Sequence, residues 1–251
     1  EIVTGTSSFK KSKNNFMKIL LTLAVFFLLT GCETAQQVLN GTNTGTPALS
    51  STEIASGLKE ALRLGTQNGT GKLAVADGFF TNAAVKILMP EEAKKVESTL
   101  RNIGLGSLVD KAVLSMNRAA EDAAKSATPI FVEAIKAMTI SDALGILKGG
   151  DYAATNYFKD KTTVSLANAF RPVIEKALTK VNATKYWNDV FTAYNKFAAK
   201  PVNTDLVTYV TEKSLTGIFY EVGQEELKIR KDPAARVTDL LKKVFGSNAQ
   251  Q

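Results

Sequence analysis

Apolar residues recur every three or four positions along most of the chain after residue 51, which is the spacing of amphipathic helices rather than of strands. The longest regular run extends from Leu105 to about Ala127. Leu114 lies opposite its apolar stripe, so this helix is expected to be contacted on two faces. A second long helix is predicted from Asp205 to about Lys231. The pattern as a whole predicts an all-α fold, a single multi-helix bundle of about eight to ten helices.

Capping residues and helix breakers indicate where these helices begin and end. Ser51-Thr52-Glu53 opens a helix that is expected to end at Gly65, and Pro90 starts one that runs to about Ile103. Thr139 to Asp142 imitates a capping box. Further boundaries are predicted at Thr128-Pro129 (a start), Gly149-Gly150-Asp151 (an end and the next cap), Pro172 (a kink), Asn182 (an end), Asp232-Pro233 (a start) and Gly246 (an end).

Residues 73–90 are less regular than the rest. Asp77-Gly78 is a turn signal, and residues 85–89 can run extended before Pro90. If the bundle includes a short extended or hairpin segment, it is expected here.

The segment before residue 51 has the pattern of a targeting sequence. Met17-Lys18 is followed by a short apolar stretch and then by Leu29-Thr30-Gly31-Cys32, which resembles the lipobox of bacterial lipoproteins. The apolar run is too short to span a bilayer comfortably. Cys32 is therefore predicted to be the lipidated first residue of the mature chain. Glu33 resembles the residue that, in enterobacteria, accompanies release to the outer membrane, so a place there facing the periplasm is expected.

The expected domain organisation follows from these boundaries. Residues 1–16 fit no signal pattern and are interpreted as a non-native segment upstream of a start at Met17, and residues 17–31 as the signal peptide. Residues 32–50 are polar and small and are predicted to be a flexible tether. The helical domain is placed at 51–246, with 247–251 as a disordered tail.

Composition excludes several kinds of chemistry. The net charge is +7, and it falls to +4 from Cys32 onward because residues 1–31 hold four lysines and one acid. Because the chain has no dense run of lysine and arginine, this excess of positive charge does not indicate nucleic-acid binding. The chain has no histidine, which excludes histidine-dependent triads. Cys32 is the only cysteine, so neither a disulfide nor a thiolate metal cluster is expected, and no cofactor is predicted.

One carboxylate occupies a position where an apolar residue is expected. Glu225 falls on the apolar stripe of the helix that starts at Asp205, and if buried it needs a partner or a proton. Asn117 and Arg118 of the central helix are the expected partners. With Glu121 and Glu225 they would form a polar pocket able to hold a small ligand or to act in acid/base chemistry. The alternative is a boundary position from which the Glu225 carboxylate reaches water.

Several segments resemble a bacterial family catalogued only as domain of unknown function 4197. They are Asn117-Arg118-Ala119-Ala120-Glu121, Ala153-Ala154-Thr155-Asn156-Tyr157-Phe158 and Asp239 to Gly246. The resemblance covers about Ser51 to Gly246. It implies a helical envelope or secreted protein, and it carries over no catalytic residue.

Three functions are compatible with these observations. The first is a non-enzymatic envelope protein, anchored in the membrane through Cys32, whose helices bind a partner protein or stabilise an assembly. The second is a carrier of a small apolar or amphipathic ligand, suggested by five aromatic residues, although such spacings are more typical of core packing: Phe158, Phe170, Trp187, Phe191 and Phe219.

The third function is a carboxylate-based hydrolase. Glu225 would be its acid/base, Arg118 would orient an anionic substrate, and Glu121 would be the second carboxylate. Since the stripe position of Glu225 is the only feature that favours it, a role without enzymatic activity is the expectation.

Overall fold

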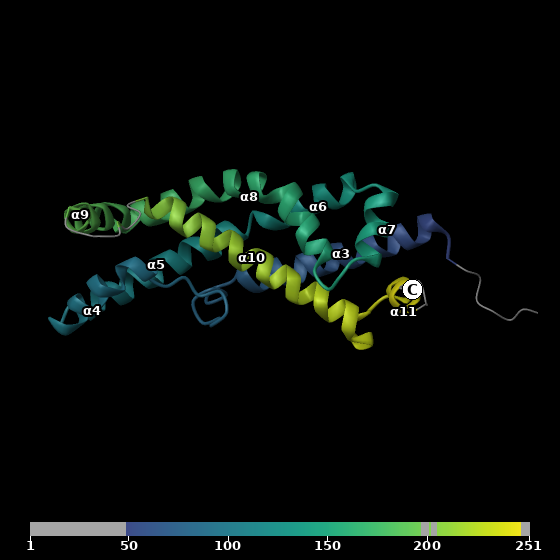
Figure 1. The fold of residues 1–251 in the computed structure, drawn as a ribbon, viewed down its shortest axis with the longest axis horizontal. Coiled ribbons are helices and arrows are strands. Elements are labelled where there is room, and N and C mark those ends of the chain that lie inside the picture. Colours follow the sequence, from purple (N-terminus) through teal and green to yellow (C-terminus); the bar gives the residue numbers. More distant parts are fainter. Residues whose placement is uncertain (1–48, 197–200, 202–204, 247–251) are drawn as a thin grey trace, which may run out of the picture. The chain divides into compact units, whose positions relative to one another are not determined.

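The computed structural model describes residues 49–196, 201 and 205–246. Cys32 and its lipobox, the signal peptide, the tether up to residue 48 and the tail 247–251 all lie outside the described residues. The described part contains nine α-helices, two short 3-10 helices and no strand, which confirms the predicted all-α bundle (Figure 1). Within it, no helix has both the length and the apolar composition that crossing a membrane requires.

Four long helices form the centre of the bundle: α3 (Ser51–Leu73), α5 (Gly106–Ala124), α8 (Ala153–Lys180) and α10 (Leu206–Lys231). Helix α10 packs against both α8 and α3, and α5 packs against α8. Five shorter helices pack against them: α4 (Lys94–Asn102), α6 (Ala127–Ala137), α7 (Ile140–Lys148), α9 (Ala183–Asn195) and α11 (Asp239–Gly246). The 3-10 helices are η2 (Glu91–Ala93) and η3 (Pro233–Ala235).

Helix α3 is longer than predicted. Ser50 and Glu53 form a capping box at its start, but the helix passes through Gly65 and ends at Leu73. Its glycines allow α10 to approach closely, since a Cβ atom at Gly69 would lie 3.0 Å from the backbone nitrogen of Val222. Tertiary packing of this face outweighs the cost of about 1 kcal/mol that a glycine adds inside a helix.

Two other predicted helix starts are corrected. Helix α6 begins at Ala127, so Pro129 lies within its first turn, and the Thr128 hydroxyl bonds to that of Thr70 at 2.7 Å instead of capping. Helix α8 has no side-chain cap from Asp151. Its first free amides donate instead to a carboxylate of α10, that of Glu226, at 2.9 Å (Ala154) and 2.8 Å (Thr155). A cap from a distant helix leaves no local sequence pattern.

Most of the remaining boundaries agree with the sequence, but the predicted start at Asp232-Pro233 is corrected: Asp232 caps only η3, and α11 begins at Asp239. Thr139 and Asp142 form the predicted capping box of α7, and hydrogen bonds from Thr139 lower the pKa of the Asp142 carboxyl. Asp205 caps α10. Helix α8 continues through Pro172 to Lys180, and Asn182 follows with a left-handed φ of 54°.

The segment 74–90 forms neither a strand nor a hairpin, so the hairpin alternative is wrong. Val85, Ile87 and Met89 are buried while Leu88 is exposed, which is the alternation that suggested a strand. No second strand pairs with it in the described part of the chain. Its backbone groups instead bond to side chains of the helices, as buried amides must.

Phe79 anchors this segment in the core. Its side chain is fully buried against α10 at Gly217, where a Cβ atom would lie 2.5 Å from the ring. The aromatic ring therefore occupies space that only a glycine leaves open.

Candidate functional site

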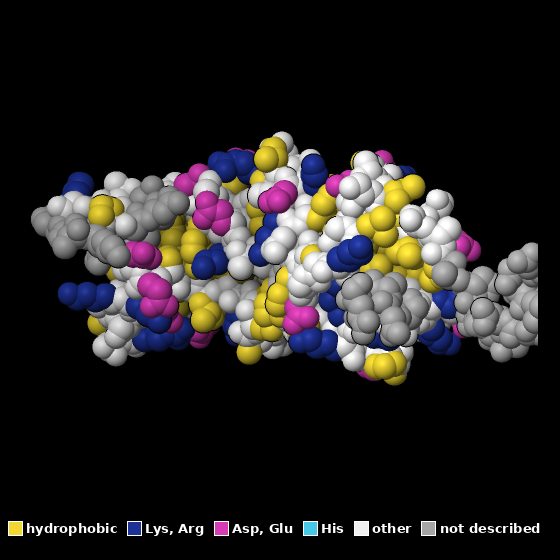
Figure 2. All heavy atoms as spheres, turned by 45° about the vertical axis from the view of Figure 1, so that its right-hand side comes forward, with side chains coloured by type: hydrophobic (Ala, Val, Ile, Leu, Met, Phe, Trp, Pro, Cys, Tyr) yellow, Lys and Arg dark blue, Asp and Glu magenta, His cyan; other side chains and the backbone are white. Residues whose placement is uncertain are grey.

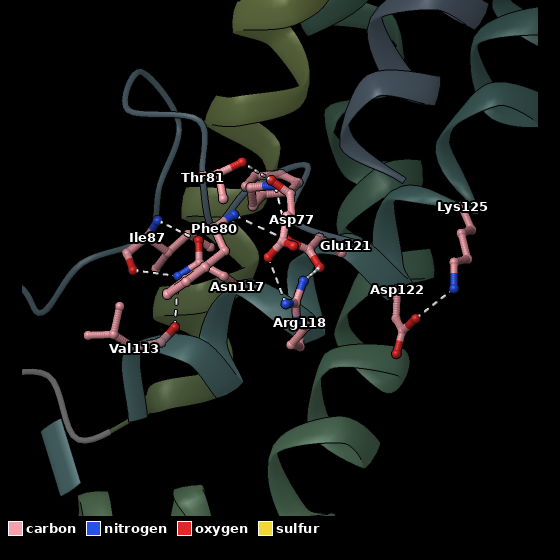
Figure 3. A network of polar contacts seen from close by, with 11 residues as sticks. Asp77, Phe80, Thr81, Ile87, Val113, Asn117, Arg118, Glu121, Asp122 and Lys125 are labelled. Carbon is pink, nitrogen blue, oxygen red and sulfur yellow. Dashed lines mark hydrogen bonds and ion pairs between the residues drawn. The ribbon is translucent and has the colours of Figure 1, made fainter. Parts of the chain in front are cut away.

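The first polar cluster is built on α5 and holds the segment 74–90 (Figure 3). The side chain of Asn117 is fully buried and clamps one residue of the segment, Ile87. Its Oδ1 accepts from the Ile87 amide at 2.9 Å, and its Nδ2 donates to the Ile87 carbonyl at 2.8 Å and to the Val113 carbonyl at 2.7 Å. Asn117 therefore replaces the strand that would otherwise pair with Ile87.

Glu121 extends this cluster by one helical turn (Figure 3). Its Oε1 accepts from the amides of Phe79 and Phe80 at 3.1 and 3.2 Å, and its Oε2 pairs with Arg118 at 2.7 Å. Arg118 also pairs with Asp77 at 2.7 Å. Hydrogen bonds to Glu121 and then to Asp77 raise the pKa of the Arg118 guanidinium. Figure 3 shows the neighbouring Asp122 turned toward Lys125 and away from Arg118.

Glu225 belongs to a second cluster, between α10 and α3. It is buried, and its carboxylate pairs with Lys72 at 2.5 Å and accepts from Asn68 at 3.4 Å. Glu221, one turn earlier, lies 3.6 Å from the same ammonium and accepts from Asn82 at 2.9 Å. The hydrogen bond to Glu225 is the main reason why the pKa of Lys72 is raised.

Of the four predicted pocket residues, Asn117, Arg118 and Glu121 belong to the first cluster. Glu225 belongs to the second. Among the described residues, no hydrogen bond or ion pair connects Glu225 with Asn117, Arg118 or Glu121. The prediction that Asn117 and Arg118 are its partners is wrong, because α3 rather than α5 supplies the groups that face it. The sequence contained one signal for the cluster between α10 and α3, namely Glu221, a second glutamate one turn before Glu225.

Both clusters use their polar groups to hold the fold together. The buried oxygens of Glu121, Glu221 and Glu225 all accept hydrogen bonds or ion pairs from neighbouring segments. In the described part of the chain, no group of three or more acidic, histidine or cysteine side chains could hold a metal ion.

A groove between α6 and α8 has a different character. Its volume is about 710 Å³, within the range of ligand sites, and it is open to solvent. Its lining is mainly apolar and comes from one face of each helix, together with the start of α7. The lining residues are Pro129, Ile130, Glu133, Ala134, Ala137, Thr139, Asp142, Tyr157, Lys161, Thr162 and Ser165.

A smaller hollow of about 400 Å³ lies where α8 gives way to α9. It is lined by polar residues, namely Thr179, Asn182, Thr184, Lys185 and Asn188. The buried hydroxyl of Thr184 has no hydrogen-bond partner there.

Comparison with known families identifies the family of this chain. The family described as Protein of unknown function (DUF4197) matches residues 48–246. The chain belongs to this family. The match begins two residues before Ser50, the cap of α3, and ends with the last residue of α11, so the DUF4197 region coincides with the described bundle. No curated protein and no solved structure matches the chain.

The aromatic residues that suggested a carrier belong to the core of the DUF4197 bundle. Phe158 and Phe219 both make edge contacts with Phe131, and Trp187 packs on Phe191 with ring centroids 4.4 Å apart. All five candidates are buried, and none of them lines the groove between α6 and α8. Any ligand site in the groove therefore depends on other residues.

The surface of the DUF4197 bundle carries mixed charge. On the face shown in Figure 2, lysine and arginine side chains alternate with aspartate and glutamate, and hydrophobic side chains lie between them. The exposed ion pairs of the bundle include Lys125–Asp122 and Lys136–Glu133.

Proposed function

We propose that this DUF4197 protein is a non-enzymatic binding protein of the bacterial envelope, and that the groove between α6 and α8 is its binding site. The observation that carries the proposal is the contrast between the groove and the two polar clusters. The clusters have their buried polar groups engaged, whereas the groove presents an apolar surface to solvent together with side chains that could bind a ligand.

The state of Glu225 argues against acid/base catalysis. A general acid or base needs a carboxylate that can reach a substrate proton. The Glu225 carboxylate is paired with Lys72 and accepts a hydrogen bond from Asn68, and Glu225 does not line the groove. The hydrolase hypothesis loses the residue on which it rested.

Attachment to the membrane through Cys32 is the second half of the proposal. It is supported by the apolar stretch after Met17 and by the residues Leu29 to Cys32, and Glu33 favours the outer membrane. The described bundle begins at Leu49, so a short polar segment would separate the lipid from α3.

Replacing Cys32 by alanine tests the anchor. We expect the variant to incorporate no labelled fatty acid and to leave the membrane fraction, because the only thiol that could be acylated is gone. A Ser51→Ala variant, changed beside the proposed tether, should fractionate like the natural chain. If the Cys32→Ala protein still carries label, the proposed anchor is wrong.

A native mass measurement tests the groove. The protein purified from its own host is expected to carry a bound ligand that is lost in a Ser165→Trp variant, because an indole at this lining position would fill the groove. Ser107→Trp is the matched control, since Ser107 is also exposed on a helix but lies on α5, away from the lining. A clean protein mass for the natural chain, or an adduct that survives in Ser165→Trp, would contradict the proposal.

A further inference from the structure

We propose that the turn between α4 and α5 inserts into the surface of a lipid bilayer, as a membrane contact made by the helical bundle itself. We call this turn, residues 102–108, the tip. The inference goes beyond the proposed function, because it depends neither on the groove nor on Cys32. It is carried by three observations: exposed apolar side chains, a fixed turn that holds them in solvent, and a stretch of chain without charge.

Three large apolar side chains of the tip face solvent within six residues of one another. Ile103 is 64% exposed, Leu105 is 41% exposed and Leu108 is 53% exposed. Between them, a Cβ atom at Gly104 would meet no neighbour within 4 Å, so this part of the turn projects into solvent. Single exposed apolar residues are common on protein surfaces, whereas a contiguous group of them indicates an interaction site.

Backbone hydrogen bonds hold the tip in one conformation. Gly104 has a left-handed φ of 82°, and its amide donates to the carbonyl of Arg101 at 3.1 Å. The amide of Leu105 donates to the carbonyl of Leu100 at 2.8 Å. These two bonds form a Schellman motif, which ends α4 and lets α5 begin in a new direction. Helix α4, which lies at one end of the bundle (Figure 1), has no buried residue and packs on α5.

The tip carries no charge. From Asn102 to Val109 the chain contains neither an acidic nor a basic residue. The nearest charged residues on either side pair with each other, since Arg101 bonds to Asp110 at 2.8 Å and to Glu97 at 2.9 Å. Inserting the tip into a bilayer therefore takes no charge out of water, which is the step that costs most in hydrocarbon. A neutral apolar tip matches a bilayer surface without net charge.

The small area of the tip favours a bilayer over a second copy of the chain. A stable protein interface buries about 800 Å² on each partner. Three partly exposed side chains at a turn offer on the order of a few hundred Å² of apolar surface, which is too little for such an interface. A bilayer needs no complementary shape, because its lipids adapt to a projecting group. Apolar side chains on a protein surface then enter it to a depth of about 5 to 10 Å.

A fluorophore at the tip tests the insertion, because Cys32 is the only natural cysteine. In the full chain with Cys32→Ala, an environment-sensitive fluorophore is attached through Ile103→Cys, and vesicles of phosphatidylcholine are added. We expect its emission to rise and shift to shorter wavelength, and nitroxide groups on the lipid chains to quench it. The fluorophore reports its own surroundings, so vesicle binding by the apolar stretch after Met17 would not by itself give this signal.

Val237→Cys provides the matched control. Val237 is an apolar residue that is 69% exposed outside the tip. A fluorophore attached there, in the same Cys32→Ala chain, should keep its emission when the vesicles are added.

Further substitutions measure how much each side chain contributes. With the fluorophore at position 103, Leu105→Ser and Leu108→Ser should each weaken partitioning into the vesicles by about five- to tenfold, because each removes apolar surface that the bilayer would cover. Val164→Ser is the matched control, since Val164 is 74% exposed on α8. Asn102→Trp should tighten partitioning, because tryptophan favours the membrane interface. A gain of this kind cannot arise from misfolding.

Three results would overturn the insertion. The first is a fluorophore at position 103 that does not respond to vesicles, and the second is an equal response at position 237. The third is a chain that sediments as a dimer without vesicles, becomes a monomer in Leu108→Ser and shows no vesicle signal, which would make the tip a contact between two copies. The groove and the Cys32 anchor stand or fall by their own tests, because neither takes part in these measurements.

Discussion

Replacing Arg230 by alanine is expected to destabilise the bundle by about 3 to 5 kcal/mol, because it removes one partner of a buried ion pair. The Arg230 and Glu226 side chains are only 8% and 5% exposed, and they form two hydrogen bonds of 3.0 and 2.8 Å. Arg230 also donates to the last carbonyls of α7, those of Ile146 and Leu147. The variant leaves a buried carboxylate without its counter-charge and a helix end without its donors.

Denaturant unfolding measures this effect, with an exposed pair as control. Lys136 and Glu133 are 67% and 72% exposed, so Lys136→Ala should change the free energy of unfolding by at most about 1 kcal/mol. Equal small losses for Arg230→Ala and Lys136→Ala would show that the buried pair is not what holds α7 and α8 on α10.

Asn117 is the second position where a large effect is expected. Asn117→Ala should destabilise the protein by about 3 kcal/mol, because it leaves the buried amide and carbonyl of Ile87 without partners. Asn117→Asp keeps the shape of the side chain but replaces the donor that faces the carbonyls of Ile87 and Val113 by an acceptor. The isosteric change should therefore be at least as harmful at neutral pH as the truncation.

Hydrogen exchange shows whether the loss is local. In both Asn117 variants the Ile87 amide should lose protection before the amides in the middle of α8 do, because Asn117 is its acceptor. Asn156→Ala changes an exposed asparagine of α8 and should stay within about 0.5 kcal/mol of the natural chain. If the Ile87 amide remains protected from exchange in Asn117→Ala, another group holds the segment 74–90.

These expectations have a bearing on function. The two residues with the largest expected effects on stability, Arg230 and Asn117, hold one segment to another within the bundle. The groove residues Lys161 and Ser165 are exposed, and their replacement should cost little stability. A loss of binding without a loss of stability is thus the result that would separate a site from a structural element.

The sequence by itself determined the helices and part of the first cluster. Periodicity and capping act within a few residues of one another, which is why the start of α10 and the capping box of α7 were predictable. Asn117, Arg118 and Glu121 could be placed side by side for the same reason, since they lie within about one turn of one helix. The family could also be recognised from local segments, and the match over residues 48–246 confirms it.

Only the tertiary structure decided which buried charges meet. Glu225 was singled out as a carboxylate in need of a partner, but the choice between α5 and α3 depends on how α10 packs, and no local pattern carries that information. The same holds for Glu226, which caps α8 from 71 residues away along the chain. Helix α3 continues beyond Gly65, because its close packing on α10 compensates for the low helix propensity of glycine. The groove could not be seen in the sequence, because its lining comes from two helices that only the fold brings side by side.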